Sequence, residues 1–173
     1  MNTTISLLSQ QEIDQFLPIF AHILENEFPG YSKNVVRYFL EKIYTKINFE
    51  WWLSQKQKII IAATKNVDLK EIVGFAVIDA PYGGVSFCRW LGIKKQYQKK
   101  GIGRQIINKW KELAIQSGSH KIEVASQPTA KEFYSKMGLE LEGMRKLSYF
   151  GIDQYIFGKV IGVPTDEIMT NTK

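Results

Sequence analysis

The chain has 173 residues, of which 45% are hydrophobic and 23% are charged, and its formal net charge at pH 7 is +6. This length fits one domain around a single hydrophobic core, and the composition is ordinary for a globular protein. No stretch approaches the roughly 20 apolar residues of a membrane-spanning helix. The chain begins without a basic segment followed by an apolar one, so we expect no signal peptide, no membrane contact and a cytoplasmic location.

Few residues of this chain suit metal or thiol chemistry. Cys88 is the single cysteine, so it cannot form an internal disulfide, and it lies within an apolar run typical of a buried strand. His22 and His120 have no partner at a ligand-like spacing, and we interpret both as structural or solvated residues. We therefore expect no metal site.

The first third of the chain is predicted to be mainly helical. A short strand over 4–7 precedes a capping box at Ser9–Glu12, and apolar residues at helical spacing then predict a helix over 13–24. A second helix is expected from Ser32, with a buried face made of Val36, Phe39, Leu40, Ile43 and Ile47.

The middle of the chain changes to the pattern of β-strands. Three apolar, β-branched runs cover 58–64, 71–79 and 85–93, and polar turns at 66–70 and 81–84 separate them. Consecutive strands joined by such short turns predict an antiparallel meander.

The last third alternates between helices and strands. The expected elements are a helix over 102–117, a strand over 121–125, a helix over 128–137, and strands over 141–149 and 154–160 around a turn at 151–153. No linker or repeat interrupts them, so we expect one domain over 1–163 and a polar tail over 164–173.

A glycine-bearing loop, Gln98-Lys-Lys-Gly101-Ile-Gly103-Arg104, joins the predicted strand over 85–93 to the next helix. Glycines allow close backbone approach to a ligand, and the unpaired N–H groups of a helix N-terminus attract anions. The clustered basic residues of the chain surround this loop: Lys94, Lys95, Lys99, Lys100 and Arg104. We interpret the loop as a phosphate site rather than a nucleic-acid surface, because the other basic residues are scattered.

Two common nucleotide-binding motifs do not account for this loop. The chain has no Gly-x-x-x-x-Gly-Lys-Ser/Thr sequence, and Gly101-x-Gly103 is not followed by the third glycine of the dinucleotide fingerprint. A meander also leads into the loop, whereas a dinucleotide-binding fold begins with alternating strands and helices.

The sequence resembles the GCN5-related N-acetyltransferase (GNAT) family. Its Gln98–Gly103 segment matches the family motif Gln/Arg-x-x-Gly-x-Gly/Ala, and Ala130–Leu139 is similar to the motif Ala-x-x-Phe-Tyr-x-x-x-Gly-Phe. The strand Ile122–Val124 resembles the family's Leu-Glu-Val, and the element order over 4–160 agrees with that of the family. The chain departs from the pattern at Gln127, where the family often has Asn, at Leu139, and in a segment before Ala130 that is shorter by one residue.

The resemblance implies the GNAT acyl-CoA N-acyltransferase fold, an α/β arrangement. A mixed, mostly antiparallel sheet of about seven strands is flanked by about four helices, and its fourth and fifth strands splay apart. It also implies acetyl-CoA as the acyl-donor cosubstrate, with pyrophosphate on the backbone of the glycine loop and pantetheine along the strand before it. The residues expected to bind it are Leu91, Gly92, Ile93, Gln98, Lys99, Lys100, Gly101, Ile102, Gly103, Arg104, Phe133 and Tyr134.

By the same resemblance, the expected activity is transfer of an acetyl group to a primary amine of a small molecule or peptide. Tyr134 is the candidate acid for the departing thiolate, and Glu123 is the candidate base, with Glu25, Glu27 and Asp79 as weaker choices. A core role for Tyr134 and a surface pairing of Glu123 with Lys121 stay open, as does a homodimer. The alternative functions are a non-catalytic acyl-CoA sensor and, with less support, a nucleic-acid binder.

The acceptor itself is not identified by the sequence. Aromatic residues are frequent in the segments expected to form an acceptor pocket, and the same residues suit a hydrophobic core: Phe28, Tyr31, Trp51, Trp52, Tyr149, Phe150 and Tyr155.

Overall fold

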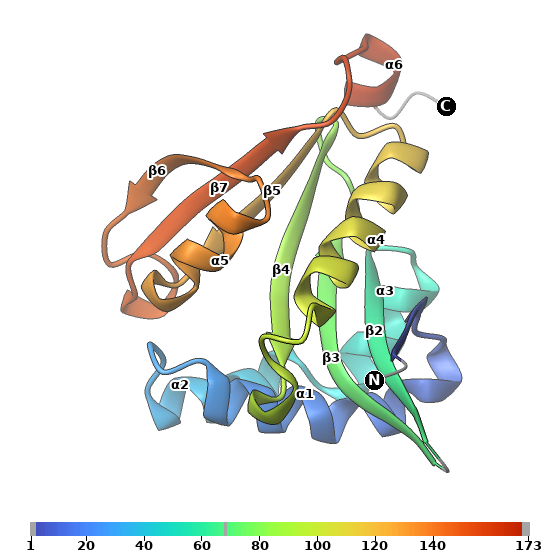
Figure 1. The fold of residues 1–173 in the computed structure, drawn as a ribbon, viewed down its shortest axis with the longest axis vertical. Helices are drawn as coiled ribbons and strands as arrows, with labels where there is room; N and C mark the ends of the chain where they lie inside the picture. The colour runs from blue at the N-terminus through green and yellow to red at the C-terminus, as the bar shows by residue number, and fades with distance from the viewer. Residues whose placement is uncertain (1–2, 68, 171–173) are drawn as a thin grey trace. The chain divides into compact units, whose positions relative to one another are not determined.

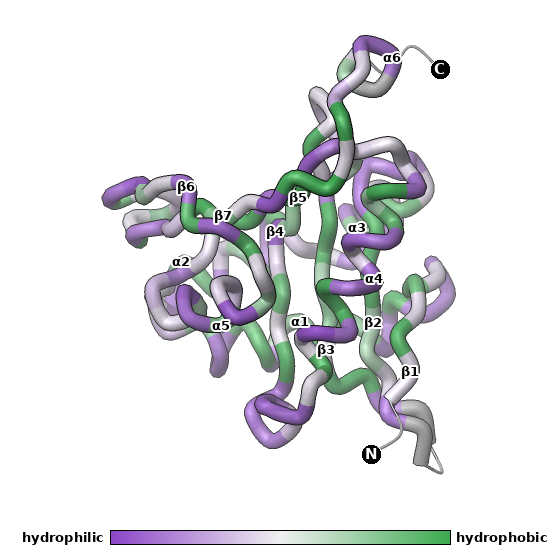
Figure 2. The backbone as a smooth tube through the Cα atoms, turned by 45° about the horizontal axis from the view of Figure 1, so that its top comes forward, coloured by the Kyte–Doolittle hydropathy of each residue, from purple (hydrophilic) through white to green (hydrophobic). Residues whose placement is uncertain are grey.

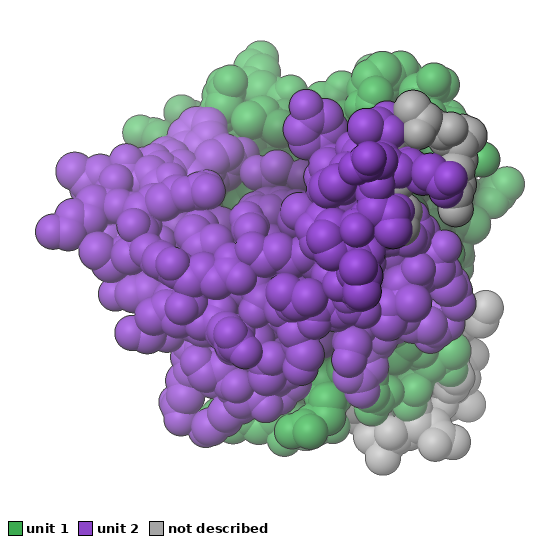
Figure 3. All heavy atoms as spheres, turned by 90° about the horizontal axis from the view of Figure 1, so that it is seen from above, with its two compact units in different colours: residues 1–77, 90–106 green, residues 78–89, 107–173 purple. Residues whose placement is uncertain are grey.

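The computed structural model describes residues 3–67 and 69–170 of the chain (Figure 1). It divides into two compact units, coloured separately in Figure 3. Unit 1 comprises the described residues of 1–77 and 90–106, and unit 2 those of 78–89 and 107–173. The chain passes between the units within two strands and within one helix, so each unit is built from separate stretches of sequence.

The strands form one seven-stranded sheet in the order β1-β2-β3-β4-β5-β7-β6. Their bounds are β1 Thr3–Leu7, β2 Lys58–Val67, β3 Leu69–Asp79, β4 Val85–Ile93, β5 Lys121–Ser126, β6 Glu140–Arg145 and β7 Gln154–Val160. The pairs β1–β2, β5–β7 and β6–β7 are antiparallel, whereas β4 and β5 are parallel over Val85–Cys88. This mixed, mostly antiparallel sheet with flanking helices confirms the predicted fold class.

Unit 1 has an aromatic core beneath helix α1 (Ile13–Glu27). The buried residues of α1 recur at helical spacing, as predicted: Ile13, Phe16, Phe20, Ile23 and Leu24. Phe16 and Phe20 pack with Phe75 of β3 at ring-centroid distances of 5.2 and 5.3 Å. The capping box before α1 is also confirmed, because the backbone N–H of Ser9 donates to Glu12 Oε2 at 2.8 Å.

The predicted second helix is interrupted. Helix α2 (Lys33–Tyr38) continues into a π-helical turn, η2 (Phe39–Ile43), and a new helix, α3, covers Lys46–Ser54. Thr45 caps α3 by accepting a hydrogen bond from the N–H of Asn48 at 3.3 Å. Because the helix restarts there, Phe49 faces the core while Ile47 is 76% exposed, so the expectation that Ile47 is buried was wrong.

Unit 2 contains β5, β7 and β6 with helix α5 (Lys131–Lys136), preceded by the 3-10 turn η4 (Pro128–Ala130). Helix α4 (Ile102–Gln116) has its first five residues in unit 1 and the remainder in unit 2. In unit 2 the fully buried Trp110 of α4 donates its indole N–H to Ser86 Oγ of β4 at 2.9 Å. This buried hydrogen bond fixes the helix on the strand.

Several predicted boundaries shift in the structure. The strand expected over 141–149 ends at Arg145, because Leu147 and Phe150 adopt left-handed φ values of 45° and 53° and the 3-10 turn η5 (Tyr149–Gly151) follows. The turn expected over 66–70 is narrower, since β2 continues to Val67 and β3 begins at Leu69, and residue 68 lies outside the described residues. The polar tail contains one helical turn, α6 (Asp166–Met169).

None of the helices in the described part of the chain has the length and apolar character needed to cross a membrane.

Candidate active site

The glycine loop lies in unit 1, between β4 and α4. The 3-10 turn η3 (Lys95–Tyr97) comes first, and the exposed segment Gln98–Gly101 leads into the N-terminus of α4. Lys99 and Gly101 have φ values of 58° and 83°, and a Cβ on Gly101 would meet nothing within 4 Å. The need for glycine at this position is therefore conformational rather than steric. Figure 2 shows this loop as a hydrophilic segment following the mixed colours of β4.

The helix that follows supplies the anion-attracting end that the sequence predicts. Ile102 and Gly103 are its first two residues and are buried, whereas Arg104 is exposed. Lys99 and Lys100 are also exposed in the preceding loop. A 15-residue helix thus begins beside three exposed cationic side chains, which favours a negatively charged ligand at its N-terminus.

Gln98 fixes the start of the loop through its side-chain amide. Its Nε2 donates to Glu27 Oε2 at 2.9 Å and to the carbonyl oxygen of Ile93 at 3.0 Å. The first motif residue is therefore bound both to the last residue of α1 and to the end of β4. Glu27, a weaker candidate base from the sequence, is engaged in positioning this loop.

Glu71 of β3 anchors η3 from a second side. Its carboxylate accepts hydrogen bonds from Lys94 Nζ at 2.8 Å and from the Tyr97 hydroxyl at 3.0 Å. The hydrogen bond from Lys94, followed by that from Tyr97, lowers the pKa of Glu71 despite the opposing effect of burial. Lys65 and Lys100 lie over the Tyr97 ring, 5.8 and 5.5 Å from its centroid. Sequence reasoning missed Glu71, because its partners are distant in the chain.

The end of β4 is held tightly against its neighbours in unit 1. A Cβ on Gly92 would collide with the side chain of Ile23 from α1, and a Cβ on Gly74 would lie 3.0 Å from Ile93 Cγ1. The backbone N–H of Lys94 donates to the carbonyl oxygen of Val73 at 3.0 Å. Gly92 thus has a packing function, and the expected binding of pantetheine by the backbone of 91–93 stays a prediction.

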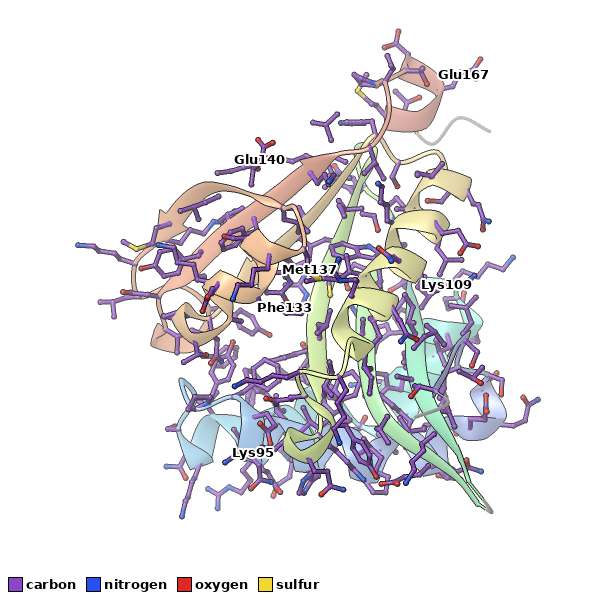
Figure 4. The ribbon with its side chains drawn as sticks, viewed as in Figure 1. Lys95, Lys109, Phe133, Met137, Glu140 and Glu167 are labelled. Atoms are coloured by element: carbon purple, nitrogen blue, oxygen red, sulfur yellow. The ribbon has the colours of Figure 1, made fainter. Side chains whose placement is uncertain are left out.

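Tyr134 lies in unit 2 on α5 and is 4% exposed. Its ring centroid is 5.0 Å from that of Phe133, whose position is labelled in Figure 4, and 5.9 Å from that of Phe157. Burial, and then the nearby Cys88, raise the pKa of the Tyr134 hydroxyl well above its usual value. At neutral pH this phenol is therefore protonated and able to donate a proton. Cys88 is itself buried, as predicted.

Glu123, the candidate base, lies in an ion-pair cluster of unit 2. Its Oε2 is 3.3 Å from Lys121 Nζ, which is also 2.5 Å from Oε2 of Glu142. Burial lowers the pKa of Lys121, but the hydrogen bonds to Glu142 and Glu123 outweigh it, so this pKa is raised and the ammonium stays charged. The structure thus shows the pairing with Lys121 that the sequence left open.

The remaining candidate residues do not form one cluster, and each has its own partners or exposure. Asp79 is paired with Arg89 at 2.6 Å, and Glu25 is exposed. Phe28 and Tyr31 pack on Trp90 in the core of unit 1, with centroid distances of 5.2 and 5.9 Å. The other aromatic candidates are a 51% exposed Trp51, a Trp52 packed on Phe49, a Tyr149–Phe150 pair and a Tyr155 beneath Lys131.

Residues 27–146 match the family described as the acetyltransferase (GNAT) domain, which is more than half of the chain. The chain belongs to the GNAT family. The matched residues include both segments that carry the resemblance, the glycine loop and helix α5. No curated protein sequence matches the chain significantly.

Solved acetyltransferase structures share this fold over nearly the whole chain. The PaiA N-acetyltransferase of Thermoplasma acidophilum, in complex with coenzyme A, superposes with a TM-score of 0.76 at 17% identity, covering 92% of this chain and 99% of that one. YncA of Salmonella typhimurium, with acetyl-CoA, has a TM-score of 0.73 at 13% identity, covering 95% and 97%. A GNAT acetyltransferase of Streptococcus pneumoniae has a TM-score of 0.73 at 21% identity, covering 93% and 100%.

In the described part of the chain, no group of three or more histidine, cysteine, aspartate or glutamate residues is arranged to hold a metal ion.

Proposed function

We propose that this GNAT protein is an acetyl-CoA-dependent N-acetyltransferase that acts on a primary amine of a small molecule or peptide. The observation that carries the proposal is the exposed loop Gln98–Gly101 at the N-terminus of α4, with its left-handed glycine and three exposed cations. Two structural neighbours were solved with coenzyme A or acetyl-CoA, which supports the same cosubstrate here.

The loop fits a pyrophosphate group on physical grounds. Space is open beside Gly101, so a ligand can approach the backbone there. The first N–H groups of α4 have no partner within the helix and can donate to phosphate oxygens. Lys99, Lys100 and Arg104 add positive charge that is partly screened by solvent. The anchors at Gln98 and Lys94–Tyr97 hold this arrangement ready before a ligand binds.

The proposed reaction is direct attack of the acceptor nitrogen on the thioester carbonyl, with cleavage of the carbon–sulfur bond. Tyr134, which is protonated at neutral pH, donates its proton to the departing thiolate, and the second proton that the attacking nitrogen loses on becoming the amide returns to the Tyr134 oxygen. A lysine-like ammonium has a pKa of about 10.4, so the acceptor must first lose a proton. Glu123 is proposed to accept it, directly or through water; its pair with Lys121 uses Oε2 and leaves Oε1 for this role.

The proposal is tested by thermal unfolding with and without acetyl-CoA. A ligand that binds only the folded state at about 100 times its Kd adds roughly 2.7 kcal/mol to the free energy of unfolding. We expect a clear rise in Tm for the unaltered protein. Replacing Gly101→Ala forces alanine into a left-handed conformation, which destabilises the fold by about 1 kcal/mol and abolishes most of the ligand-induced shift.

Gly151→Ala is the matched control. Gly151 also has a left-handed φ, 79°, with nothing within 4 Å of its Cβ position, but it lies in η5 of unit 2. It should lose similar basal stability and keep the full acetyl-CoA shift. Absence of any shift in the unaltered protein at high acetyl-CoA excess would refute the proposed cosubstrate. A shift without release of coenzyme A across a broad amine panel would instead support a sensor.

A further inference from the structure

A cavity of about 420 Å³ lies in unit 1 between helix α1 and the turn η3. This volume falls within the range of about 300–1,000 Å³ that is typical of small-molecule sites. Its described lining residues are Ile19 and His22 of α1, with Lys94, Lys95 and Gln96 at η3. None of these belongs to the segment Gln98–Arg104, so the proposed pyrophosphate site does not account for the cavity.

The two walls of the cavity are fixed relative to each other. Gln98, directly after η3, donates to Glu27 of α1 at 2.9 Å. Ile23 of α1 packs so closely on Gly92, near the end of β4, that a Cβ on Gly92 would collide with it. Because these contacts hold α1 against η3, the cavity is formed before a ligand enters, and binding requires little ordering of the protein.

The charge in the cavity amounts to one unpaired cation. Lys94 Nζ is matched by Glu71 at 2.8 Å, and only 18% of the Lys94 side chain is exposed. Lys95 is exposed, and within the described residues its ammonium has no acidic partner. Of the described lining residues, none is acidic. Lys95, which is labelled in Figure 4, therefore makes the cavity attractive to a single negative charge.

His22 adds a neutral donor, because Asn26 sets its tautomer. The Nδ2 amide of Asn26 donates to the carbonyl oxygen of His22 at 2.7 Å, which fixes the orientation of the amide, since its oxygen could not donate there. The same Nδ2 lies 3.4 Å from His22 Nδ1, so the neutral imidazole accepts at Nδ1 and carries its proton at Nε2. The Gln96 amide is a second neutral donor, and its side chain is exposed.

We propose that this cavity is a binding site for a small organic monocarboxylate with an apolar body. The carboxylate pairs with Lys95 and accepts hydrogen bonds from His22 Nε2 and the Gln96 amide. The apolar body lies against Ile19, which is half-buried. One cation and two neutral donors suit a single charge better than the double charge of a phosphate dianion. The site goes beyond the proposed acetyltransferase function and does not depend on it.

The test is an NMR titration of the full chain without acetyl-CoA, with isotope labels on the backbone amides and on the isoleucine methyl groups. Benzoate is the probe, because it has one carboxylate and an apolar ring, and benzamide is its neutral counterpart of similar shape. The signals of Ile19, Lys95 and Gln96 should move saturably with benzoate, with a Kd on the order of 1 mM, as expected for so small a ligand. Benzamide should bind about fivefold more weakly.

Two lysine variants assign this preference to Lys95. Lys95→Gln should raise the Kd for benzoate by about fivefold, the effect of losing one exposed charge pair, and should leave the binding of benzamide unchanged. Lys33→Gln removes the same charge from an exposed position at the start of α2 in the same unit, and should leave both affinities unchanged. Both lysines are exposed, so the amide spectra of the variants should show the native fold.

Absence of saturable shifts at Ile19, Lys95 and Gln96 overturns the proposal. Equal affinity for benzoate and benzamide also overturns it, because the cavity then has no preference for an anion. Equal weakening by both lysine variants would attribute binding to the net charge of the chain, and tighter binding of inorganic phosphate at the same signals would refute the carboxylate class.

Acetyl-CoA is added in a second titration. If it displaces benzoate competitively, the cavity belongs to the acetyl-CoA site and a separate site is ruled out. Because the first titration contains no acetyl-CoA, its failure would leave the proposed acetyltransferase function untouched. Failure of the thermal-unfolding test with acetyl-CoA would likewise leave the benzoate result as it stands.

Discussion

If the Tyr134 hydroxyl takes part in the reaction near neutral pH, it can do so as a proton donor and not as a base. Because burial and Cys88 raise its pKa, it stays protonated and can donate but not accept the reacting proton. Replacing Tyr134→Phe removes only the hydroxyl and preserves the ring that packs on Phe133 and Phe157. If Tyr134 is the acid, kcat should fall by about 100-fold while the Kd for acetyl-CoA changes little.

Steady-state kinetics and calorimetric titration separate these two effects. Tyr82→Phe offers a matched control, because Tyr82 is 87% exposed in the same unit and should tolerate loss of its hydroxyl without effect. If kcat is unchanged in Tyr134→Phe, then Tyr134 is a core residue and another group protonates the thiolate.

At the scale of elements, the short turn η3 is held by Glu71 through Lys94 and Tyr97. These hydrogen bonds lower the pKa of Glu71 in the folded protein. A carboxyl group with a lowered folded pKa stabilises the fold above its unfolded pKa, about 4.3, and this contribution is lost as pH falls through the folded pKa. The Glu71 side chain is 38% exposed, so we expect a contribution of at most about 1 kcal/mol at pH 7.

Glu71→Gln should therefore be less stable than the unaltered protein at pH 7, and the difference should shrink as pH falls through and below the folded pKa. Urea unfolding at a series of pH values measures it. Glu167→Gln, at an exposed position of α6, should show no comparable pH-dependent difference. If the difference in free energy of unfolding between Glu71→Gln and the unaltered protein persists at acid pH, the lost stability comes from packing rather than from the charge of Glu71.

The elements of this chain show which features the sequence could predict. The loop at Gly101 was predictable because its signal is local: glycine spacing, neighbouring cations and a following helix. The break between α2 and α3 was not, because apolar residues continue at helical spacing through it, and only Thr45 offers a capping signal. A β-bulge in β6 also escaped prediction, since it depends on which β7 residues Leu141 and Gly143 oppose.

In the candidate site, as in the fold, the sequence indicated the local motifs but not the contacts between distant residues. Motif resemblance identified Gln98 and Tyr134, but it could not show that Gln98 donates to Glu27, 71 residues away in the chain. The partners of Glu71, Lys94 and Tyr97, are likewise 23 and 26 residues away in the chain, whereas Lys121, the partner of Glu123, is two residues away and could be considered from the sequence. Local motifs thus indicate the ligand. The carboxylates that hold the motif residues in place can be identified only once the fold is known.

At the scale of the whole molecule, the two units carry different parts of the proposed chemistry. Unit 1 holds the glycine loop, and unit 2 holds Tyr134 and Glu123. Strands β3 and β4 and helix α4 each contribute residues to both units, so these three elements connect the parts covalently. The chain as a whole has a formal net charge of +6, and its clustered basic residues lie around the loop in unit 1.

This charge distribution predicts that acetyl-CoA binding depends on ionic strength. The ligand is a polyanion, and Lys99, Lys100 and Arg104 are exposed, so salt should screen their attraction to it. We expect the Kd for acetyl-CoA to rise by about tenfold between low and high salt, as the Debye length falls from about 30 Å to about 3 Å. Dephospho-acetyl-CoA, which carries less negative charge, should show a shallower dependence on salt in the same titration.

Two lysine variants assign this effect to the loop. Lys100→Gln should reduce the salt dependence, because it removes a charge beside the proposed phosphate site. Lys109→Gln removes the same charge from a later turn of α4, where Lys109 is paired with Glu112 at 2.9 Å, and should leave the dependence unchanged (Figure 4). Equal effects of both variants would show that the net charge of the chain, and not the cluster around Gly101, attracts the ligand. A Kd that does not change with salt would mean that backbone N–H groups bind the phosphates with no measurable help from these lysines.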